Sequence, residues 1–147
     1  MTVCALIVAA GTGERLGGGL PKQYRLLGGK PVIAHAVDAL AGHPAISEVR
    51  VVIGSGQEEL ARAALTGRAV GDFLVGGATR ADSVRSGLAA ISGDAVLVHD
   101  AARPFCPPEV IDALLHALEF HDGAAPVLGV GDTVARATAT LGEAVDR

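Results

Sequence analysis

A glycine-rich segment that carries two cations follows the first apolar run of the chain. Residues 11–22 read GTGERLGGGLPK and include Arg15 and Lys22. Backbone N–H groups of such a loop can surround phosphate oxygens, and arginine and lysine add charge-assisted hydrogen bonds. The segment therefore indicates a polyphosphate site. Taken alone, it fits an exposed loop with two solvated cations equally well.

The segment departs from the two most familiar phosphate-binding patterns. The sequence G-x-x-x-x-G-K-[ST] of the P-loop is absent. Gly11 and Gly13 begin a G-x-G-x-x-G pattern, but the third glycine, Gly17, comes one position late. The second expected strand also ends in Gly-Ser-Gly where a dinucleotide site has an acidic residue. A dinucleotide site is therefore not favoured.

A carboxylate and an arginine follow another apolar run, in HDAARP at residues 99–104. Mg²⁺ in proteins commonly binds one or two carboxylates together with substrate phosphates, so Asp100 is a candidate metal ligand. The alternative is that Asp100 caps a turn. Arg103 lies three residues further on, and we interpret His99 as structural.

A third segment, GGATRADSV at residues 76–84, combines glycines with a small hydroxyl residue. Its backbone groups and Ser83 could recognise a base edge or a ribose. The alternative is a simple turn with an N-terminal helix cap.

Alternating apolar runs and helical patterns predict how these segments are positioned. Near-continuous apolar strands are typical of a parallel sheet that is covered on both faces. We expect an α/β fold with a Rossmann-like, doubly wound, mainly parallel sheet and helices on both faces. Ligands bind such sheets beyond the carboxyl ends of the strands, where the strand order reverses, and all three segments fall at such ends. The expected strands are 3–9, 49–54, 73–76, 95–100 and 124–130, and the expected helices are 31–40, 57–65, 80–91 and 107–121.

Composition excludes several classes of protein. Half of the 147 residues are apolar and the net charge is −4, which excludes disorder and argues against a nucleic-acid partner. The sequence has no apolar run of membrane-span length and no signal peptide, so we expect a cytoplasmic protein without a membrane partner. Cys4 and Cys106 form no metal-binding pattern.

We expect residues 1–147 to be a single domain, shortened at its C-terminal end, from the front of a longer protein.

Four motifs occur together in one order: AAGTGERLGGGLPKQY, GGATRADSV, HDAARPF and GDTV. In this combination the chain resembles the 2-C-methyl-D-erythritol 4-phosphate cytidylyltransferase family of the non-mevalonate isoprenoid pathway. The resemblance implies the nucleotide-diphospho-sugar transferase type of Rossmann-like fold. It also implies a reaction in which CTP and methylerythritol phosphate give the CDP-alcohol and pyrophosphate, with Mg²⁺ as cofactor.

The resemblance assigns the nucleotide site by position. Arg15 and Lys22 would hold the phosphates of CTP and stabilise the pentavalent transition state. The residues implied to surround CTP are Ala9, Ala10, Gly11 and Gly13, and those implied to recognise its cytidine are Gly77, Ala78 and Ser83.

The resemblance also assigns the second substrate. Asp100 would bind Mg²⁺ and orient the substrate, while Arg103 and Thr133 would contact methylerythritol phosphate. Arg147 would reach the active site of the neighbouring subunit in a homodimer. No protein nucleophile is implied, because the substrate phosphate attacks the α-phosphorus directly and catalysis consists of positioning and electrostatics.

Two rival functions remain at the sequence level. A ribitol-phosphate cytidylyltransferase would share the fold and CTP, but its relatives tend to carry valine where this chain has Ala102. A non-catalytic nucleotide-binding domain is disfavoured because Arg15, Lys22 and Asp100 are all retained. Some bacterial relatives are fused to a cyclodiphosphate synthase, and the sequence does not decide whether this protein is.

Overall fold

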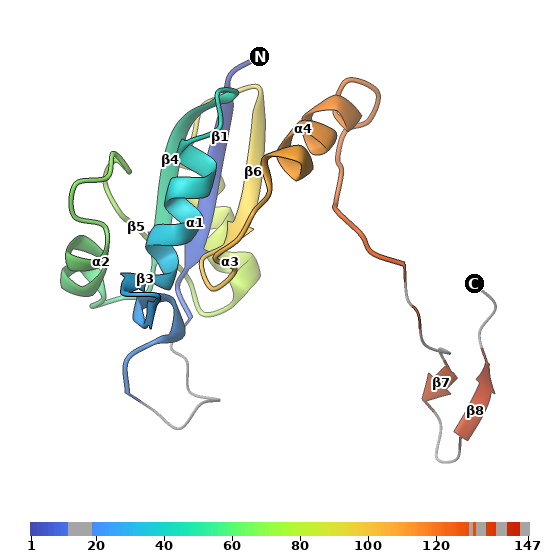
Figure 1. The fold of residues 1–147 in the computed structure, drawn as a ribbon, viewed down its shortest axis with the longest axis horizontal. Coiled ribbons are helices and arrows are strands. Elements are labelled where there is room, and N and C mark those ends of the chain that lie inside the picture. The colour runs from blue at the N-terminus through green and yellow to red at the C-terminus, as the bar shows by residue number, and fades with distance from the viewer. Residues whose placement is uncertain (12–18, 130, 132–134, 138–140, 145–147) are drawn as a thin grey trace. The chain divides into compact units, whose positions relative to one another are not determined.

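In the described part of the chain, four parallel strands form the central sheet (Figure 1). The computed structural model describes residues 1–11, 19–129, 131, 135–137 and 141–144. The strands are β1 (Val3–Ala9), β4 (Ile46–Ile53), β5 (Leu74–Val75) and β6 (Ala95–Asp100), and their order in the sheet is β5-β4-β1-β6. This sheet lies in the first of two compact units, Met1–Ile111 and Asp112–Arg147.

The central strands are buried because helices cover both faces of the sheet. Helix α1 (Val32–Ala41) lies in front of β1 and β4 in Figure 1, and α3 (Arg80–Leu88) lies behind them. Leu6 and Ile7 on β1 are fully buried. A Cβ on Gly87 of α3 would lie 2.5 Å from Cδ2 of Leu6, so glycine permits the close contact between this helix and the sheet. The predicted doubly wound arrangement is confirmed.

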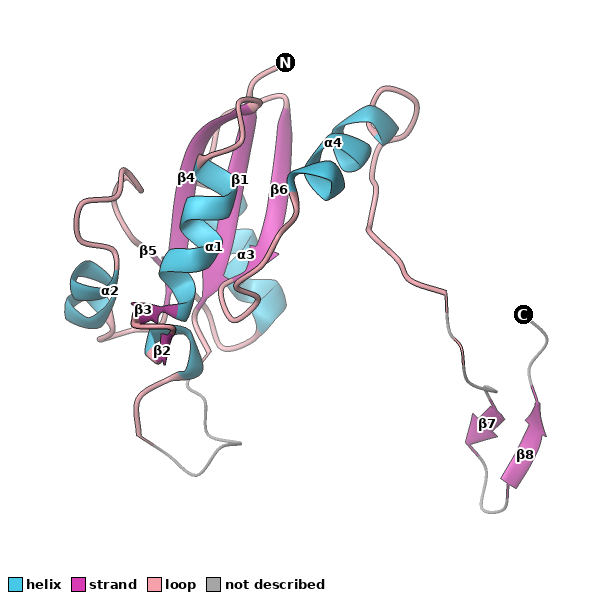
Figure 2. Cartoon of the chain, viewed as in Figure 1, coloured by secondary structure: helices cyan, strands magenta, loops and turns pink. Residues whose placement is uncertain are grey.

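Further helices and strands lie outside this layered core (Figure 2). The described residues also form a 3₁₀ turn, η2 (Lys22–Tyr24), and the helices α2 (Glu58–Ala64) and α4 (Pro108–Ala117). Two antiparallel hairpins, not anticipated from the sequence, pair β2 (Leu26–Leu27) with β3 (Lys30–Pro31) and β7 (Ala135–Ala137) with β8 (Leu141–Ala144). No helix in the described residues has the length and apolar character needed to cross a bilayer.

The strand expected at residues 124–130 is wrong over its described part. Residues 124–129 belong to no strand, and Val127 and Leu128 are 86% and 95% exposed. A strand exists only when a neighbour satisfies its backbone groups, and no described segment pairs with this run. Apolar composition alone therefore did not determine the local structure here.

The expected helices 80–91 and 107–121 also end earlier, at Leu88 and Ala117.

The strand order places the switch point of the sheet beside β1. Strands β1, β4 and β5 follow one another outward on one side, and β6 then pairs with the opposite edge of β1. The order therefore reverses between β1 and β6. In an open parallel sheet this position, at the carboxyl ends of the strands, is where ligands bind.

Asp38 on α1 joins three segments through ion pairs. Its carboxylate accepts hydrogen bonds at 2.6 and 2.9 Å from the guanidinium of Arg68, and it also pairs with Lys30 of β3. The pKa of Asp38 is lowered from 3.8 to about 2, chiefly by the hydrogen bonds from Arg68 and in addition by Lys30, against the opposing effect of partial burial.

We expect this cluster to make stability depend on pH at the acidic end. Because the folded pKa is depressed, its contribution is present above the ordinary value of 3.8 and is lost as the pH falls towards about 2. Solvent screening of these partly exposed groups limits the effect of Asp38→Asn to about 1 kcal/mol at neutral pH. Urea unfolding across this range should show the difference from the parent protein shrinking as the pH falls. An equal difference at every pH would contradict the assignment, and Asp72→Asn, at an exposed position, is the control.

Candidate active site

The carboxyl ends of three strands approach one another closely around Ala10, directly after β1. A Cβ on Gly76 would lie 2.6 Å from Cβ of Ala10, and one on Gly54 would lie 3.3 Å from the carbonyl oxygen of Ala10. On the other side of β1, Val8 is in register with Asp100, and the N–H of Ala101 donates to the carbonyl of Val8 at 3.0 Å. Backbone and small side chains thus line the switch point.

The structure brings the described parts of the three predicted segments to this edge of the sheet. Ala9, Ala10 and Gly11 end or follow β1, Gly77 and Ala78 follow β5, and Asp100 ends β6. Four predicted site residues, Gly13, Arg15, Thr133 and Arg147, lie outside the described residues.

Lys22 begins the η2 turn immediately after the glycine-rich segment. The turn is held by hydrogen bonds from the Tyr24 N–H to the Pro21 carbonyl and from the Arg25 N–H to the Lys22 carbonyl, at 3.0 and 3.2 Å. Lys22 is exposed and forms no ion pair with any residue that the structure describes. Its charge is therefore available to an anionic ligand as far as the described residues are concerned.

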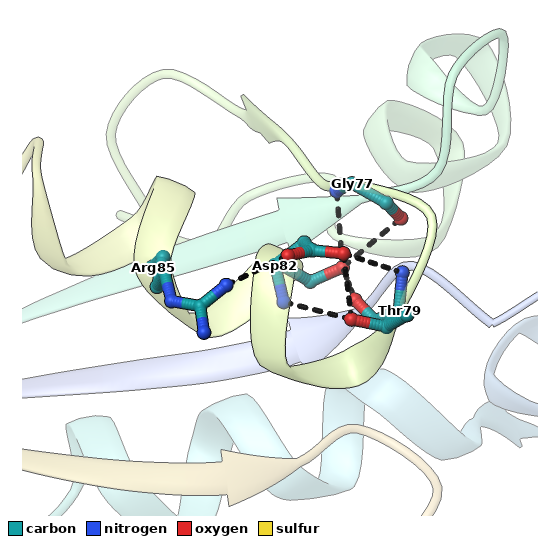
Figure 3. Close-up of polar contacts among 5 residues, drawn as sticks. Gly77, Thr79, Asp82 and Arg85 are labelled. Atoms are coloured by element: carbon teal, nitrogen blue, oxygen red, sulfur yellow. Dashed lines mark hydrogen bonds and ion pairs between the residues drawn. The ribbon is translucent and has the colours of Figure 1, made fainter.

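The loop between β5 and α3 is held by a capping box (Figure 3). The Asp82 N–H donates to Oγ1 of Thr79 at 3.1 Å, and Oδ2 of Asp82 accepts from the Thr79 hydroxyl at 2.7 Å and from its N–H at 3.2 Å. The second carboxylate oxygen of Asp82 accepts from Arg85 at 2.8 Å. A Cβ on Gly77 would lie 2.5 Å from Cβ of Asp82, so the loop packs closely on the first turn of α3.

The buried Ser83 side chain forms hydrogen bonds to the backbone of the same loop. It is only 1% exposed, and its Oγ accepts from the Gly77 N–H at 3.2 Å and donates to the Thr79 carbonyl at 3.0 Å. The helix cap, which was one of the two alternatives from the sequence, is therefore present in this segment. The segment also presents backbone near the switch point. A direct contact of Ser83 with a nucleoside stays a prediction.

Asp100 forms a charged cluster with two arginines. Its Oδ1 accepts from Arg80 Nε and Nη2 at 3.0 and 2.9 Å, and its Oδ2 accepts from Arg103 Nε at 3.3 Å. Partial burial alone would raise the pKa of Asp100, but the two guanidinium groups outweigh it and hold the pKa below its usual value. The His99 ring hydrogen-bonds to the Arg103 carbonyl at 2.9 Å, which agrees with the structural interpretation of His99.

Sequence reasoning missed Arg80, although a local signal exists. Arg80 is the first residue of α3, where the partial positive charge of the helix N-terminus disfavours a cation. A residue that breaks a local rule without a local compensation points to a role set by the rest of the fold. Here the compensation is Asp100, twenty positions away in the sequence, at the end of β6.

The donor set around Asp100 fits a magnesium ion that is shared with a substrate. Among the described residues, no group of three or more His, Cys, Asp or Glu side chains could hold a metal by itself. Mg²⁺ that bridges substrate phosphates requires only one or two protein carboxylates, and it retains water molecules for the other positions. Asp100 could supply one such ligand beside the end of β1.

Comparisons with known proteins agree with this geometry. The family model for 2-C-methyl-D-erythritol 4-phosphate cytidylyltransferase, IspD, matches residues 3–147. The chain is 61% identical over 146 residues to a bifunctional enzyme IspD/IspF of Rhizorhabdus wittichii, a match that covers 99% of this chain and 38% of the relative. The chain thus spans well under half the length of this curated relative.

Solved structures give the same result. The 2-C-methyl-D-erythritol 4-phosphate cytidylyltransferase of Thermus thermophilus superposes with a TM-score of 0.77 at 34% identity, over 99% of this chain and 64% of that one. The bifunctional IspDF of Campylobacter jejuni superposes with a TM-score of 0.77 at 28% identity, over 91% of this chain and 35% of that one. The chain belongs to the 2-C-methyl-D-erythritol 4-phosphate cytidylyltransferase family.

Proposed function

We propose that the protein transfers the cytidylyl group of CTP to 2-C-methyl-D-erythritol 4-phosphate and releases pyrophosphate. The observation that supports this proposal is the small-residue backbone edge at Ala10, with Asp100 in register with Val8 of β1. The exposed Lys22 directly precedes Gln23, which bonds to the Ala9 and Gly11 carbonyls at the same edge. These are the parts that a reaction on a triphosphate requires: room for phosphate, a cation and a ligand for a metal. Membership of the family supplies the identity of the two substrates.

In the proposed reaction, a phosphate oxygen of methylerythritol phosphate attacks the α-phosphorus of CTP. The bond from this phosphorus to the oxygen that bridges to the β-phosphate breaks, and pyrophosphate leaves. Negative charge increases on the α-phosphate oxygens in the transition state, so Lys22, together with Arg15, would stabilise it there. Asp100 would hold Mg²⁺, which when bound neutralises part of the triphosphate charge.

The other site assignments are part of the same proposal. The backbone at Ala9, Ala10, Gly11 and Gly13 would surround the triphosphate, and the loop with Gly77, Ala78 and Ser83 would recognise cytidine. The substrate phosphate would be bound by Arg103 and Thr133 and by Arg147 of the other subunit of a homodimer. A cytoplasmic location remains a prediction.

Pyrophosphate release tests the proposal. The protein expressed from its complete gene is incubated with CTP, Mg²⁺ and either methylerythritol phosphate or ribitol phosphate. Release with the first substrate only is the expected result. Turnover with ribitol phosphate alone would make the protein the ribitol enzyme, and CTP binding without turnover on either substrate would make it a regulatory domain.

We expect Ser83→Ala to weaken CTP binding more than it slows turnover. The substitution removes the hydroxyl that bonds to the Gly77 N–H and the Thr79 carbonyl, so the loop proposed to recognise cytidine loses its support. Loss of buried hydrogen bonds of this kind costs about 1–2 kcal/mol, roughly a tenfold increase in the Kd for CTP. Titration calorimetry with CTP measures it. Ser86→Ala, at an exposed position of the same helix, is the matched control and should bind CTP normally.

A further inference from the structure

Gln23, the residue after Lys22, bonds to the backbone on both sides of Ala10. The residue is 5% exposed, and its Nε2 donates to the Ala9 carbonyl at 2.7 Å and to the Gly11 carbonyl at 2.9 Å. Both bonds are long-range in sequence, since the partners lie fourteen and twelve positions before Gln23. The two N–H groups of one carboxamide therefore link the residue that follows segment 11–22 to the backbone where that segment begins.

This arrangement is specific in its chemistry. Two carbonyl oxygens that converge on one position require a group with two donors and no negative charge, and an amide nitrogen provides it. Burial increases the cost of losing the bond to Ala9, because a buried carbonyl without a partner retains its full desolvation penalty.

The turn that carries Gln23 is fixed on its other side as well. The Tyr24 side chain is 5% exposed, and its hydroxyl donates to Oε1 of Gln57 at 3.0 Å. Lys22 itself is exposed, so its own side-chain packing does not hold it in place. The position of the Lys22 backbone is thus set by its neighbours in the η2 turn, and among them only Gln23 bonds to the end of β1.

We propose that Gln23 is a positioning residue that holds Lys22 against the end of β1, so that the lysine ammonium is aligned with the α-phosphate during cytidylyl transfer. The role rests on the proposed function. Gln23 contacts no substrate in this proposal and acts through Lys22. Misplacing a catalytic group by about 1 Å can cost on the order of 100-fold in rate, so a residue of this kind affects kcat.

The first test replaces the carboxamide by a group of similar size without donors. Gln23→Met should lower kcat roughly 10- to 100-fold and change the Kd for CTP by less than about threefold, because Lys22 is proposed to act on the transition state. Tyr24→Phe is the matched control, since it removes a buried hydrogen bond from the same turn but leaves both Gln23 bonds in place. This variant should lower the Tm and retain kcat. Equal losses of kcat in both variants would mean a general structural effect and would overturn the proposal.

A double variant tests whether Gln23 acts through Lys22. If it does, Lys22→Ala with Gln23→Met should be no slower than Lys22→Ala alone, because the positioned group is already absent. Multiplied losses would overturn the proposal.

Gln23→Glu gives a readout that remains usable if the methionine variant does not fold. The ionised carboxylate would face two carbonyl oxygens without a donor, whereas the protonated acid can donate to one of them. The activity relative to the parent protein should therefore rise as the pH is lowered. A constant ratio across pH would overturn the proposal.

The outcomes separate this role from the proposed function. A parent protein that is inactive with CTP and methylerythritol phosphate would overturn both. An active parent whose Gln23 variants keep the parental kcat would overturn the positioning role alone.

Discussion

Replacing Lys22 by alanine should lower kcat on the order of 10²- to 10³-fold, while the KM for CTP changes far less. The reason is that charge on the α-phosphate oxygens rises between the bound substrate and the transition state. Lys22 is exposed at the start of η2, beside the switch point, and the described residues offer it no counter-ion. A cation in this setting interacts most strongly with the state that carries the most negative charge. Single-turnover kinetics and CTP binding together measure the two effects separately.

The other lysine of the chain supplies the matched control. Lys30 lies on the β2–β3 hairpin and pairs with Asp38 on α1, in the ion-pair cluster described above. Lys30→Ala removes the same charge and side chain, so it should lower stability slightly and leave kcat unchanged. Near-normal turnover by Lys22→Ala would remove Lys22 from the catalytic residues. A comparable loss in both variants would indicate a general effect of charge.

Local patterns in the sequence predicted the strands whose apolar runs are paired in the central sheet. Strands β1 and β6 have the predicted bounds, 3–9 and 95–100, because each contains an apolar run that is paired in the sheet. Because both strands were expected in one parallel sheet, their carboxyl ends also predicted that Ala10 and Asp100 would lie at the same edge. Residues 124–129 are also apolar, yet pairing decides whether such a run becomes a strand, and pairing is not a local property.

The supporting side chains of the site could not be predicted in the same way. Gln23 and Arg80 are ordinary polar residues in sequence, and their partners lie twelve to twenty positions away. Ser83 was recognised by its motif, but its burial and its bonds to Gly77 and Thr79 depend on how α3 packs on the sheet. Sequence reasoning therefore found the residues proposed to face the ligands better than the residues that hold them in place.

The metal-binding role proposed for Asp100 can be tested separately from a structural role, because its backbone and its side chain form different bonds. The bond that closes the turn after β6 runs from the Arg103 N–H to the backbone carbonyl of Asp100, at 3.0 Å. The carboxylate itself bonds to the side chains of Arg80 and Arg103, which are 61% and 75% exposed. Exposed ion pairs of this kind contribute only about 0–1 kcal/mol to stability. Asparagine retains the size of the side chain and the backbone turn, so it removes the charge with little effect on the fold.

We therefore expect Asp100→Asn to lower kcat/KM by about 10²-fold or more and to require more Mg²⁺ for half-maximal activity, with a Tm close to that of the parent. The loss combines a missing metal ligand with two guanidinium groups that are no longer neutralised at the switch point. Activity measured over a Mg²⁺ series and thermal unfolding measured without substrate distinguish these effects from loss of structure. Asp94→Asn is the control, because Asp94 bonds to the Thr2 N–H just before β6 begins, far along the strand from its carboxyl end. A large fall in Tm for Asp100→Asn would favour the turn-capping interpretation, and an unchanged Mg²⁺ dependence would remove Asp100 from the metal site.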